Sequence, residues 1–422
     1  MPLAIALLAA TLQTQSWEVK KLGVGGESTV TSDNKGSVFV TYHQPCELKI
    51  SRDWGATFTE KHEYPAGLGD MHIVSYGKDK LHLTFMLNSM DGIQNYYSLD
   101  NGKTMKEGSV VKGPYDREWI AVNAKTEEVF FNYSDGYIGG PKSKGIYIEK
   151  STNGGRDFER IGRVDNEVAT SYAVDPYLIS TPGGKLYAAY ATSLDYDTVN
   201  SYKFCYSEDN GKTWKGHTLL ATTHADWGDT QERWTLGGIA SFGENRVVAY
   251  YQDYGKLEVD GQSRQPLLTY VRISDDGGKT FGKPTTILPM DELKDAIRSY
   301  VQNKKQAINI PIYVQTLPWL AADPNGNFHA CFVDNRNGQG EIAGKPYNKW
   351  HTRYTYLATG DREFGLSEVV GKDVVSLRPP LDFNSCFADS KYVYITYSEA
   401  PNSRSEWDFS GDLYLARKKI GE

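Results

Sequence analysis

The chain has 422 residues, with 53 acidic and 46 basic side chains, and therefore a formal net charge of −7. A chain this acidic has no general attraction for nucleic acid or for an anionic membrane, so we expect neither as a partner. Aromatic residues make up 13% of the sequence and glycines number 41. This mixture is typical of short strands joined by tight turns.

Residues 1–10 form an apolar run, which the polar residues 13–16 follow. A run of this length is too short to span a bilayer, but it fits a signal peptide. We therefore predict a signal peptide over residues 1–16 and a secreted or periplasmic protein without membrane insertion. A misassigned chain start is the alternative. The remainder, residues 17–422, is predicted to form a single domain.

Short segments of alternating or β-branched residues follow one another through this domain, separated by glycine-rich breaks. Their composition and period predict strands rather than helices. In chain order the predicted strands are 28–31, 38–42, 48–51, 71–74, 81–85, 119–122, 129–133, 177–180, 186–190, 238–241, 246–251, 319–322, 327–333, 383–388, 392–397 and 412–418.

One segment departs from the strand pattern. Residues 290–303 carry acids at their start and place Leu293, Ile297, Tyr300 and Val301 on one helical face. This pattern predicts a helical insertion near 290–304. We expect it to pack on the surface, with a cap over the functional face as the alternative.

An eight-residue pattern occurs five times, and we call its copies the repeat turns. They begin at Ser51, Ser98, Ser151, Ser207 and Ser274. A short carboxylate or amide can bond nearby backbone N–H groups, a glycine can take positive φ, and a large apolar residue can anchor the turn. Successive copies begin 47 to 67 residues apart, which fits one four-stranded propeller blade with its loops. Residues 358–364 resemble a decayed sixth copy.

The pattern of Ser, Asp, Gly, Thr and an aromatic residue resembles the Asp-box, or bacterial neuraminidase repeat, of sialidase-like β-propellers. The resemblance implies an all-β fold of four-stranded antiparallel blades, in which Asp53, Asp100, Asp209 and Asp276 serve the fold rather than the chemistry. We count seven blades, with residues 17–22 adding the outer strand of the last. Six blades, the number in sialidases, is the alternative.

Charged and aromatic residues gather where the innermost strands begin, on the face predicted to carry the longer loops. Acids beside arginines and aromatic walls suit sugar recognition, because rings stack on sugar faces while charged groups bind hydroxyls. We predict substrate binding by Arg117, Glu118, Trp119, Asp175, Arg233, Trp234, Trp319, Arg336 and Arg378.

The resemblance assigns catalytic roles to some of these positions. It implies exo-acting, sialidase-type hydrolysis in which three arginines, Arg117, Arg233 and Arg378, hold a substrate carboxylate. Tyr172 would be the nucleophile and Glu232 its partner, and Asp70 or Asp116 would be the acid. The early Arg-Ile-Pro signature of sialidases is absent, because the corresponding residues are 25–30, Gly-Gly-Glu-Ser-Thr-Val.

Two other functions stay open. A uronate polysaccharide lyase would need a base, from His72 or Tyr172, and an arginine such as Arg117 to neutralise the substrate carboxylate. A non-catalytic propeller would bind glycan or protein with the same face. Two carboxyl groups beside arginine would favour hydrolysis, and a plugged face would favour binding.

The sequence predicts no cofactor and no catalytic metal. A structural Ca²⁺ at Asp195, Asp197 or residues 224–229 is the alternative to ordinary solvated turns. Cys331 and Cys386 lie in similar strand contexts on neighbouring predicted blades, and we expect buried free thiols, with a disulfide as the alternative. We expect a carbohydrate as the ligand and a monomer as the oligomeric state.

Overall fold

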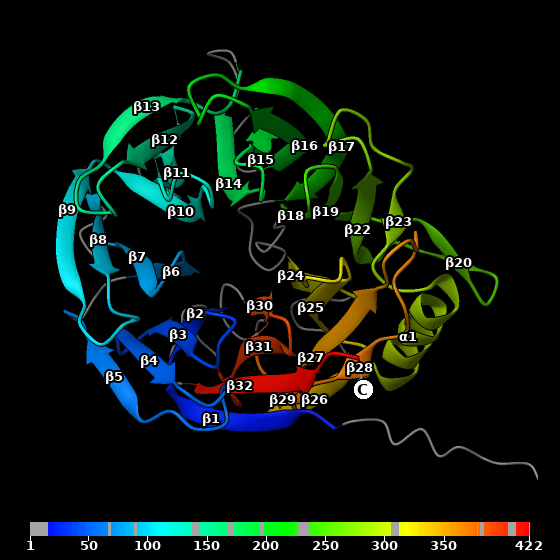
Figure 1. Cartoon of the computed structure of the whole chain (residues 1–422). Coiled ribbons are helices and arrows are strands. Elements are labelled where there is room, and N and C mark those ends of the chain that lie inside the picture. Colours follow the sequence, from blue (N-terminus) through cyan, green and yellow to red (C-terminus); the bar gives the residue numbers. More distant parts are fainter. Residues whose placement is uncertain are drawn as a thin grey trace, which may run out of the picture.

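The computed structural model describes residues 16–65, 69–87, 91–136, 144–167, 172–194, 198–226, 237–304, 312–377, 379, 384–403 and 411–421, without the side chains of residues 174, 175, 198 and 224–226. Seven radial sheets stand in a closed ring around an axis (Figure 1). The predicted all-β, seven-bladed propeller is therefore confirmed.

Each blade is an antiparallel sheet whose first strand lies nearest the axis. The first blade contains β2 (Gly26–Ser32), β3 (Val38–His43), β4 (Glu47–Ser51) and β5 (Glu60–Glu63), and the second contains β6 (Gly69–Tyr76), β7 (Lys80–Met86), β8 (Gly92–Ser98) and β9 (Lys106–Lys112). The third blade contains β10 (Tyr115–Val122), β11 (Val129–Asp135), β12 (Ile146–Ser151) and β13 (Glu159–Arg163). The fourth contains β14 (Tyr172–Ser180), β15 (Leu186–Ser193), β16 (Thr198–Ser207) and β17 (Lys215–Asp226).

The other three blades vary more at their outer edges. They are β18 (Gly238–Phe242), β19 (Arg246–Tyr254), β22 (Leu267–Ser274) and β23 (Thr285–Thr286); β24 (Gln315–Ala322), β25 (Phe328–Asp334) and β27 (Lys345–Leu357), with short β26 (Gln339–Ile342), β28 (Glu368–Val369) and β29 (Val374–Val375) beside β27; β30 (Ser385–Ala388), β31 (Tyr392–Glu399), β32 (Asp412–Lys419) and β1 (Glu18–Val24). The hairpin of β20 (Leu257–Val259) and β21 (Gln262–Arg264) stands apart.

The N-terminal strand closes the ring, as the sequence predicts. β1 pairs antiparallel with β32, and the two strands lie side by side in Figure 1. The Nη2 atom of Arg417 lies 2.5 Å from an oxygen of Glu18, and Lys21 lies 2.7 Å from Asp412. Joining both ends of the chain in one blade leaves no open sheet edge between the first and last blades.

Neighbouring blades pack face to face through apolar side chains. Between blades one and two, for example, Phe39, Ile50, Ile73 and Leu83 belong to one buried cluster. Because both faces of a blade meet a neighbour, a middle strand such as β3 is buried along its whole length. Cys331 and Cys386 also lie buried, between blades six and seven, as free thiols in agreement with the sequence prediction.

The repeat turns join the third and fourth strands of the first five blades and share one hydrogen-bond pattern. In the fourth blade, Ser207 Oγ donates to Asp209 at 2.8 Å, and Gly211 N–H donates to Ser207 Oγ at 2.9 Å. Thr213 donates to the Asp209 carboxylate from its backbone N–H and its hydroxyl, at 2.9 and 2.7 Å. Gly211 has a φ of 80°, and a Cβ there would lie 3.0 Å from Ile161 of the preceding blade. The position therefore needs glycine for both its conformation and its packing.

The third repeat turn exchanges two chemical roles. Asn153 stands where the other copies carry Asp, and Asp157 stands where they carry Thr. The Asn153 amide donates to Asp157 at 2.9 Å, so an amide–carboxylate pair replaces the carboxylate–hydroxyl pair. The turn keeps a side-chain hydrogen bond between these two positions, because the donor and the acceptor are exchanged together.

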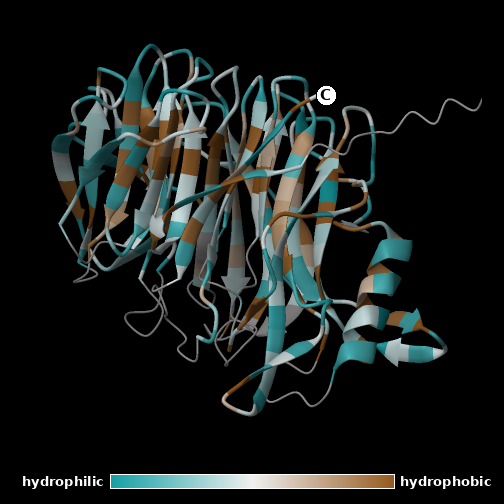
Figure 2. Ribbon diagram, turned by 90° about the horizontal axis from the view of Figure 1, so that it is seen from below, coloured by the Kyte–Doolittle hydropathy of each residue, from teal (hydrophilic) through white to brown (hydrophobic). Residues whose placement is uncertain are grey.

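The two faces of the ring differ. The repeat turns and the first hairpin turn of each blade share one face, as the bond between the Asn123 amide and Asn210 of a repeat turn shows, at 3.0 Å. The C-terminus ends on this face, at the top of Figure 2, and α1 (Met290–Asn303) lies toward the other. We call them the turn face and the long-loop face.

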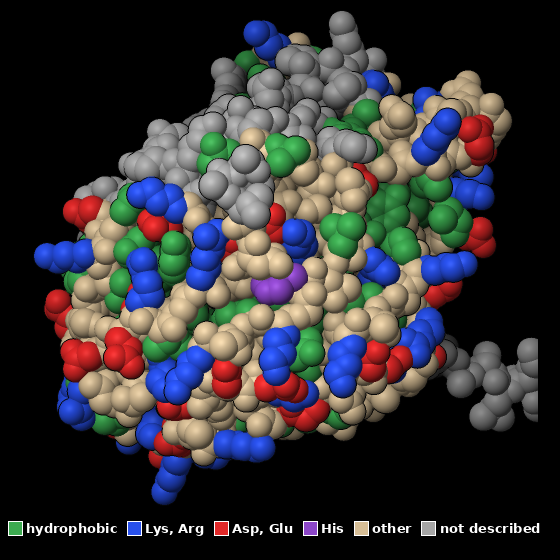
Figure 3. Space-filling model, turned by 90° about the horizontal axis from the view of Figure 1, so that it is seen from above, with side chains coloured by type: hydrophobic (Ala, Val, Ile, Leu, Met, Phe, Trp, Pro, Cys, Tyr) green, Lys and Arg blue, Asp and Glu red, His purple; other side chains and the backbone are tan. Residues whose placement is uncertain are grey.

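The helix occupies the position that the sequence predicts. Leu293, Ile297 and Tyr300 are buried in an apolar cluster with residues of blades five and six, which makes α1 a packed surface helix. Val301, predicted on the same face, is instead 38% exposed, because the contact ends one residue earlier. In the part of the chain that the structure describes, no helix is long and apolar enough to cross a membrane. The outer wall seen in Figure 3 mixes acidic and basic side chains.

Candidate functional site

The innermost strands share a local irregularity on the long-loop face. Their pairing with the second strand shifts just before Thr29, His72, Trp119, Tyr177 and Trp319, in five different blades. Such bulges bend a strand and turn side chains out of the regular alternation. They therefore decide which side chains point toward the axis and which lie between blades.

Four of these bulges hold a residue with positive φ. The φ angles are 46° at Glu27, 45° at Asp70, 59° at Arg117 and 50° at Leu317. Non-glycine residues take this conformation at a cost of about 1 to 3 kcal/mol, so the surrounding structure must hold them there. One structural position thus presents two acids and an arginine from three successive blades. The sequence marked Asp70 and Arg117 as charged residues near strand starts and did not single out Glu27.

Glu118 is a buried acid of this face with a raised pKa. Its side chain, 2% exposed, lies in the β10 bulge, and among the described residues neither carboxyl oxygen has a hydrogen-bond partner of ordinary geometry. Burial, with the negative charges of Asp70 and Asp116, raises the pKa of Glu118 well above its ordinary value of 4.5. A carboxyl group in this setting holds its proton more tightly than an exposed one.

Glu27, in the bulge of the first blade, offers a comparison with Glu118 in the bulge of the third. It is also buried, but its Oε2 atom lies 3.1 Å from Nδ1 of His43. This acid therefore has a basic partner, and Glu118 has none among the described residues. The comparison singles out the group of Asp70, Asp116 and Glu118, which we call the acid cluster.

Aromatic rings close the axis beside the acid cluster. Ring centroids lie 4.9 Å apart for Trp119 and Trp319, 4.6 Å for Trp119 and Tyr177, and 4.9 Å for His72 and Trp119. We call these four residues the aromatic plug. On the long-loop side the plug leaves a recess of about 10 Å³, lined by Arg117, Trp119, Tyr177, Tyr250 and Trp319 among others. A cavity of this size holds about one water molecule.

The structure brings several predicted site residues together. Asp70, Asp116, Arg117, Glu118 and Trp119 lie at the starts of adjacent inner strands β6 and β10. Tyr172 begins the next inner strand, β14, whose contacts with β10 are extensive, and Trp319 belongs to the plug. Glu232, Arg233, Trp234 and Arg378, and the side chain of Asp175, lie outside the described residues. Their roles remain predictions.

Arg336 is held in a different setting. Its guanidinium donates to Asp334 at 2.7 Å and to Glu292 of α1 at 2.8 Å. Together with Arg353 and His351, these groups form a buried ion network that joins α1 to blade six. The arrangement gives Arg336 a structural role in attaching the helix.

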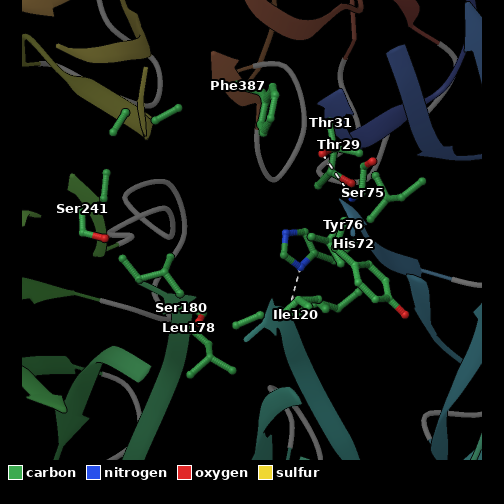
Figure 4. A pocket seen from close by; sticks show the side chains of 18 of the residues that line it. Thr29, Thr31, His72, Ser75, Tyr76, Ile120, Leu178, Ser180, Ser241 and Phe387 are labelled. Atoms are coloured by element: carbon green, nitrogen blue, oxygen red, sulfur yellow. Dashed lines mark hydrogen bonds between the residues drawn. The ribbon is translucent and has the colours of Figure 1, made fainter. Parts of the chain in front are cut away.

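His72 lines the turn-face cavity and is not among the residues that line the long-loop recess. Its Nδ1 atom accepts a hydrogen bond from the Ile120 backbone N–H at 2.8 Å, and burial lowers its pKa from 6.5 to about 3. The ring lines a cavity on the turn-face side of the plug (Figure 4). This placement does not favour His72 as the base of a lyase acting at the long-loop face.

The alternative calcium residues, Asp195, Asp197 and positions 224–229, lie outside the described residues or have side chains that do. Among the side chains that are described, no group of three or more His, Cys, Asp or Glu could hold a metal ion.

Comparisons with known proteins find similarity to solved structures only. No protein-family model and no curated protein matches the sequence. Among solved structures, the chain is similar to an α-L-arabinanase of Penicillium chrysogenum complexed with arabinobiose, at 12% identity and a TM-score of 0.48, covering 83% of this chain and 93% of that one. It is also similar to a Hadza microbial sialidase, at 12% identity and a TM-score of 0.49, covering 91% and 73%. A polysaccharide lyase, an ulvan lyase, matches at 10% identity and a TM-score of 0.44, covering 76% of each chain.

Proposed function

We propose that this chain is a sialidase-like propeller that hydrolyses a glycosidic bond at its long-loop face. The observation that carries the proposal is the acid cluster, in which burial and two further carboxyl groups raise the pKa of Glu118. Glycoside hydrolysis uses a pair of carboxyl groups, one of which must hold a proton for the leaving oxygen. Neighbouring carboxyl groups in a dry setting cannot all ionise, so the cluster retains such a proton.

The three acids of the cluster differ in solvent exposure, and we assign their roles accordingly. Asp116 is half-buried, whereas Asp70 and Glu118 are buried, so Asp116 is the carboxyl that a sugar can reach. In this proposal Asp116 meets the leaving oxygen, and Glu118 stores the proton behind it. Tyr172 acts as nucleophile with Glu232 as its base. Arg117, with Arg233 and Arg378, binds the carboxylate of the sugar, as the resemblance implies.

A second candidate is a non-catalytic glycan- or protein-binding propeller. It is favoured by the aromatic plug, since the recess of about 10 Å³ beside Arg117 and Trp119 is too small for a sugar ring. In that case the ligand would lie on the surface of the face rather than enter the axis.

A hydrolysis screen separates these functions. The purified chain is incubated with sialosides, neutral glycosides and uronate polymers, and the products are assayed for new reducing ends and for the ultraviolet absorbance of an unsaturated sugar. Release of sialic acid is expected. Reducing ends from neutral glycosides alone would replace the sialidase assignment, ultraviolet absorbance would indicate a lyase, and binding without product would indicate the second candidate.

Matched variants connect the activity to the site. Asp116→Asn and Arg117→Ala should each lower turnover by about 100-fold or more, because each removes a charged group at the reacting sugar. Arg156→Ala is the control, since Arg156 is exposed on the third repeat turn, in the same blade but on the opposite face. Equal activity of Arg117→Ala and Arg156→Ala would remove Arg117 from the site.

A further inference from the structure

The axis holds a second cavity on the turn-face side of the aromatic plug. It has a volume of about 450 Å³ and is lined by the inner strands of all seven blades. This volume lies within the range of small-molecule sites, about 300 to 1,000 Å³. His72, Tyr177 and Trp319 line it, so the plug forms one end. At the other end it reaches Gly77, Ala124 and neighbouring residues of the first hairpin turns.

The wall combines apolar side chains with polar groups, and serine hydroxyl groups lie toward its rim. Ile120 and Leu178 line it next to Ser180 and Ser241, and the close view shows these side chains around a shared hollow (Figure 4). Ser75, Ser180 and Ser241 near the turn face are half-buried rather than buried, so solvent reaches this end. The cavity is therefore a cup that opens toward the turn face.

His72 gives the cup one directed hydrogen-bond donor. Because its Nδ1 accepts the Ile120 N–H at 2.8 Å, the proton of the neutral ring is on Nε2. Figure 4 shows the ring projecting into the cavity with Nε2 directed away from the Ile120 bond. Burial lowers the pKa of His72 to about 3, so the ring is neutral near pH 7 and Nε2 donates without carrying charge.

The cup carries little charge of its own. Glu127 is a carboxylate among the lining residues, and Lys80 pairs with it. An ionic ligand would therefore lose its hydration without gaining an opposite charge, whereas an uncharged ring compound would lose little.

We propose that this cup is a second ligand site, separate from the acid cluster, for an uncharged and largely apolar ring compound whose carbonyl or ether oxygen accepts a hydrogen bond from His72 Nε2. The apolar walls cover the ring, and the hydroxyl rim meets its solvent-facing edge. The plug separates this ligand from the long-loop face, so the two sites share the rings of Tyr177 and Trp319.

Fluorescence titration with prodan tests the proposal, because prodan is an uncharged naphthalene ketone whose emission moves to shorter wavelength in apolar surroundings. The wild type should show saturable binding with such a shift. Ser241→Trp, which places an indole in the cup, should abolish the shift. His72→Phe, which keeps a ring but removes the donor, should weaken binding by about tenfold, the value of one hydrogen bond near 1.4 kcal/mol.

The matched control is Ser263→Trp, which adds the same indole at an exposed position of β21 outside the cup. It should bind prodan as the wild type does. Circular dichroism and thermal unfolding confirm that each variant is folded, and Ser241→Trp provides the test if His72→Phe does not fold. The proposal is overturned if the wild type gives no saturable shift, or if Ser241→Trp binds prodan as tightly as Ser263→Trp.

Discussion

Replacement of Glu118 by glutamine tests whether the acid cluster holds a proton. The change keeps the shape of the side chain but fixes it in an uncharged form. In the wild type, burial and the charges of Asp70 and Asp116 raise the pKa of Glu118 well above 4.5. Among the described residues neither carboxyl oxygen makes a hydrogen bond of ordinary geometry, so the substitution removes at most a weak contact with Thr84. We therefore expect a stability effect that depends on pH.

The sign follows from proton linkage. Between the ordinary pKa of 4.5 and the higher pKa in the folded state, the folded wild type binds a proton that the unfolded chain has released. Its free energy of unfolding therefore falls by about 1.4 kcal/mol for each pH unit in this window. Glu118→Gln lacks this dependence, so its stability relative to the wild type should be nearly unchanged at low pH and should rise with pH.

Glu149→Gln is the matched control in the same blade. The Glu149 carboxylate accepts a hydrogen bond from Tyr133 at 2.6 Å and lies 3.4 Å from Arg160. Glu149→Gln removes the negative charge that Tyr133 and Arg160 contact. This variant should therefore be less stable than the wild type by about 1 to 3 kcal/mol near neutral pH. The two substitutions are chemically identical but should differ in sign.

Urea unfolding of the three proteins from about pH 5 to about pH 8 measures these free energies. If the proposed hydrolysis is confirmed, Glu118→Gln should also lower turnover, because the amide has no proton to transfer, while the protein stays folded. A stability difference between Glu118→Gln and the wild type that does not grow with pH would refute the protonated carboxyl, whatever the activity.

Three further predictions concern the scaffold. Asp209→Ala removes the hydrogen-bond acceptor of a repeat turn and should lower the free energy of unfolding by about 1 kcal/mol, seen as a lower melting temperature, without affecting sugar binding. An unchanged melting temperature would contradict a stabilising role of these hydrogen bonds. His351 is buried, yet the adjoining Asp334 raises its pKa above 6.5, so its contribution to stability is present below that pH and lost above it. The stability of His351→Gln should therefore fall less steeply above pH 6.5 than that of the wild type. Parallel stability–pH profiles of the two proteins would contradict this. Trp350→Ala should lower the free energy of unfolding by roughly 3 to 5 kcal/mol, because Trp350 is fully buried. Trp214 is half-buried, so Trp214→Ala should lower this free energy by less. Chemical unfolding of both variants compares the two values.

The blades could be predicted because their signals are local. Each repeat turn carries its own hydrogen-bond partners within seven residues, from Ser207 to Thr213 in the fourth blade, so the sequence alone specifies the turn and its place after a third strand. The helix at Met290–Asn303 shows the same locality, since its apolar period is complete within the segment.

The roles of the site residues could not be read in this way. Glu118 and Arg336 each stand two residues after an aspartate in the sequence. One is a buried carboxyl with no hydrogen-bond partner of ordinary geometry among the described residues, and the other binds Glu292 of α1. The difference arises from residues distant in the chain, namely Asp70 from the preceding blade and Glu292 from the helix. Their proximity is set by ring closure and by one-residue bulges, which have no fixed sequence signal.

The aromatic plug links the chemistry of the two faces. Large rings occupy the plug position on β6, β10, β14 and β24, whereas Gly238 stands at the corresponding pairing position of β18. A Cβ at Gly238 would meet the Tyr250 hydroxyl at 2.3 Å, so this blade fills the axis with a ring from its second strand instead. The rings leave room for about one water molecule at this level, and the low dielectric around them strengthens the repulsion among the carboxyl groups beside them. The same ring layer that closes one end of the second cavity therefore helps to raise the pKa of Glu118.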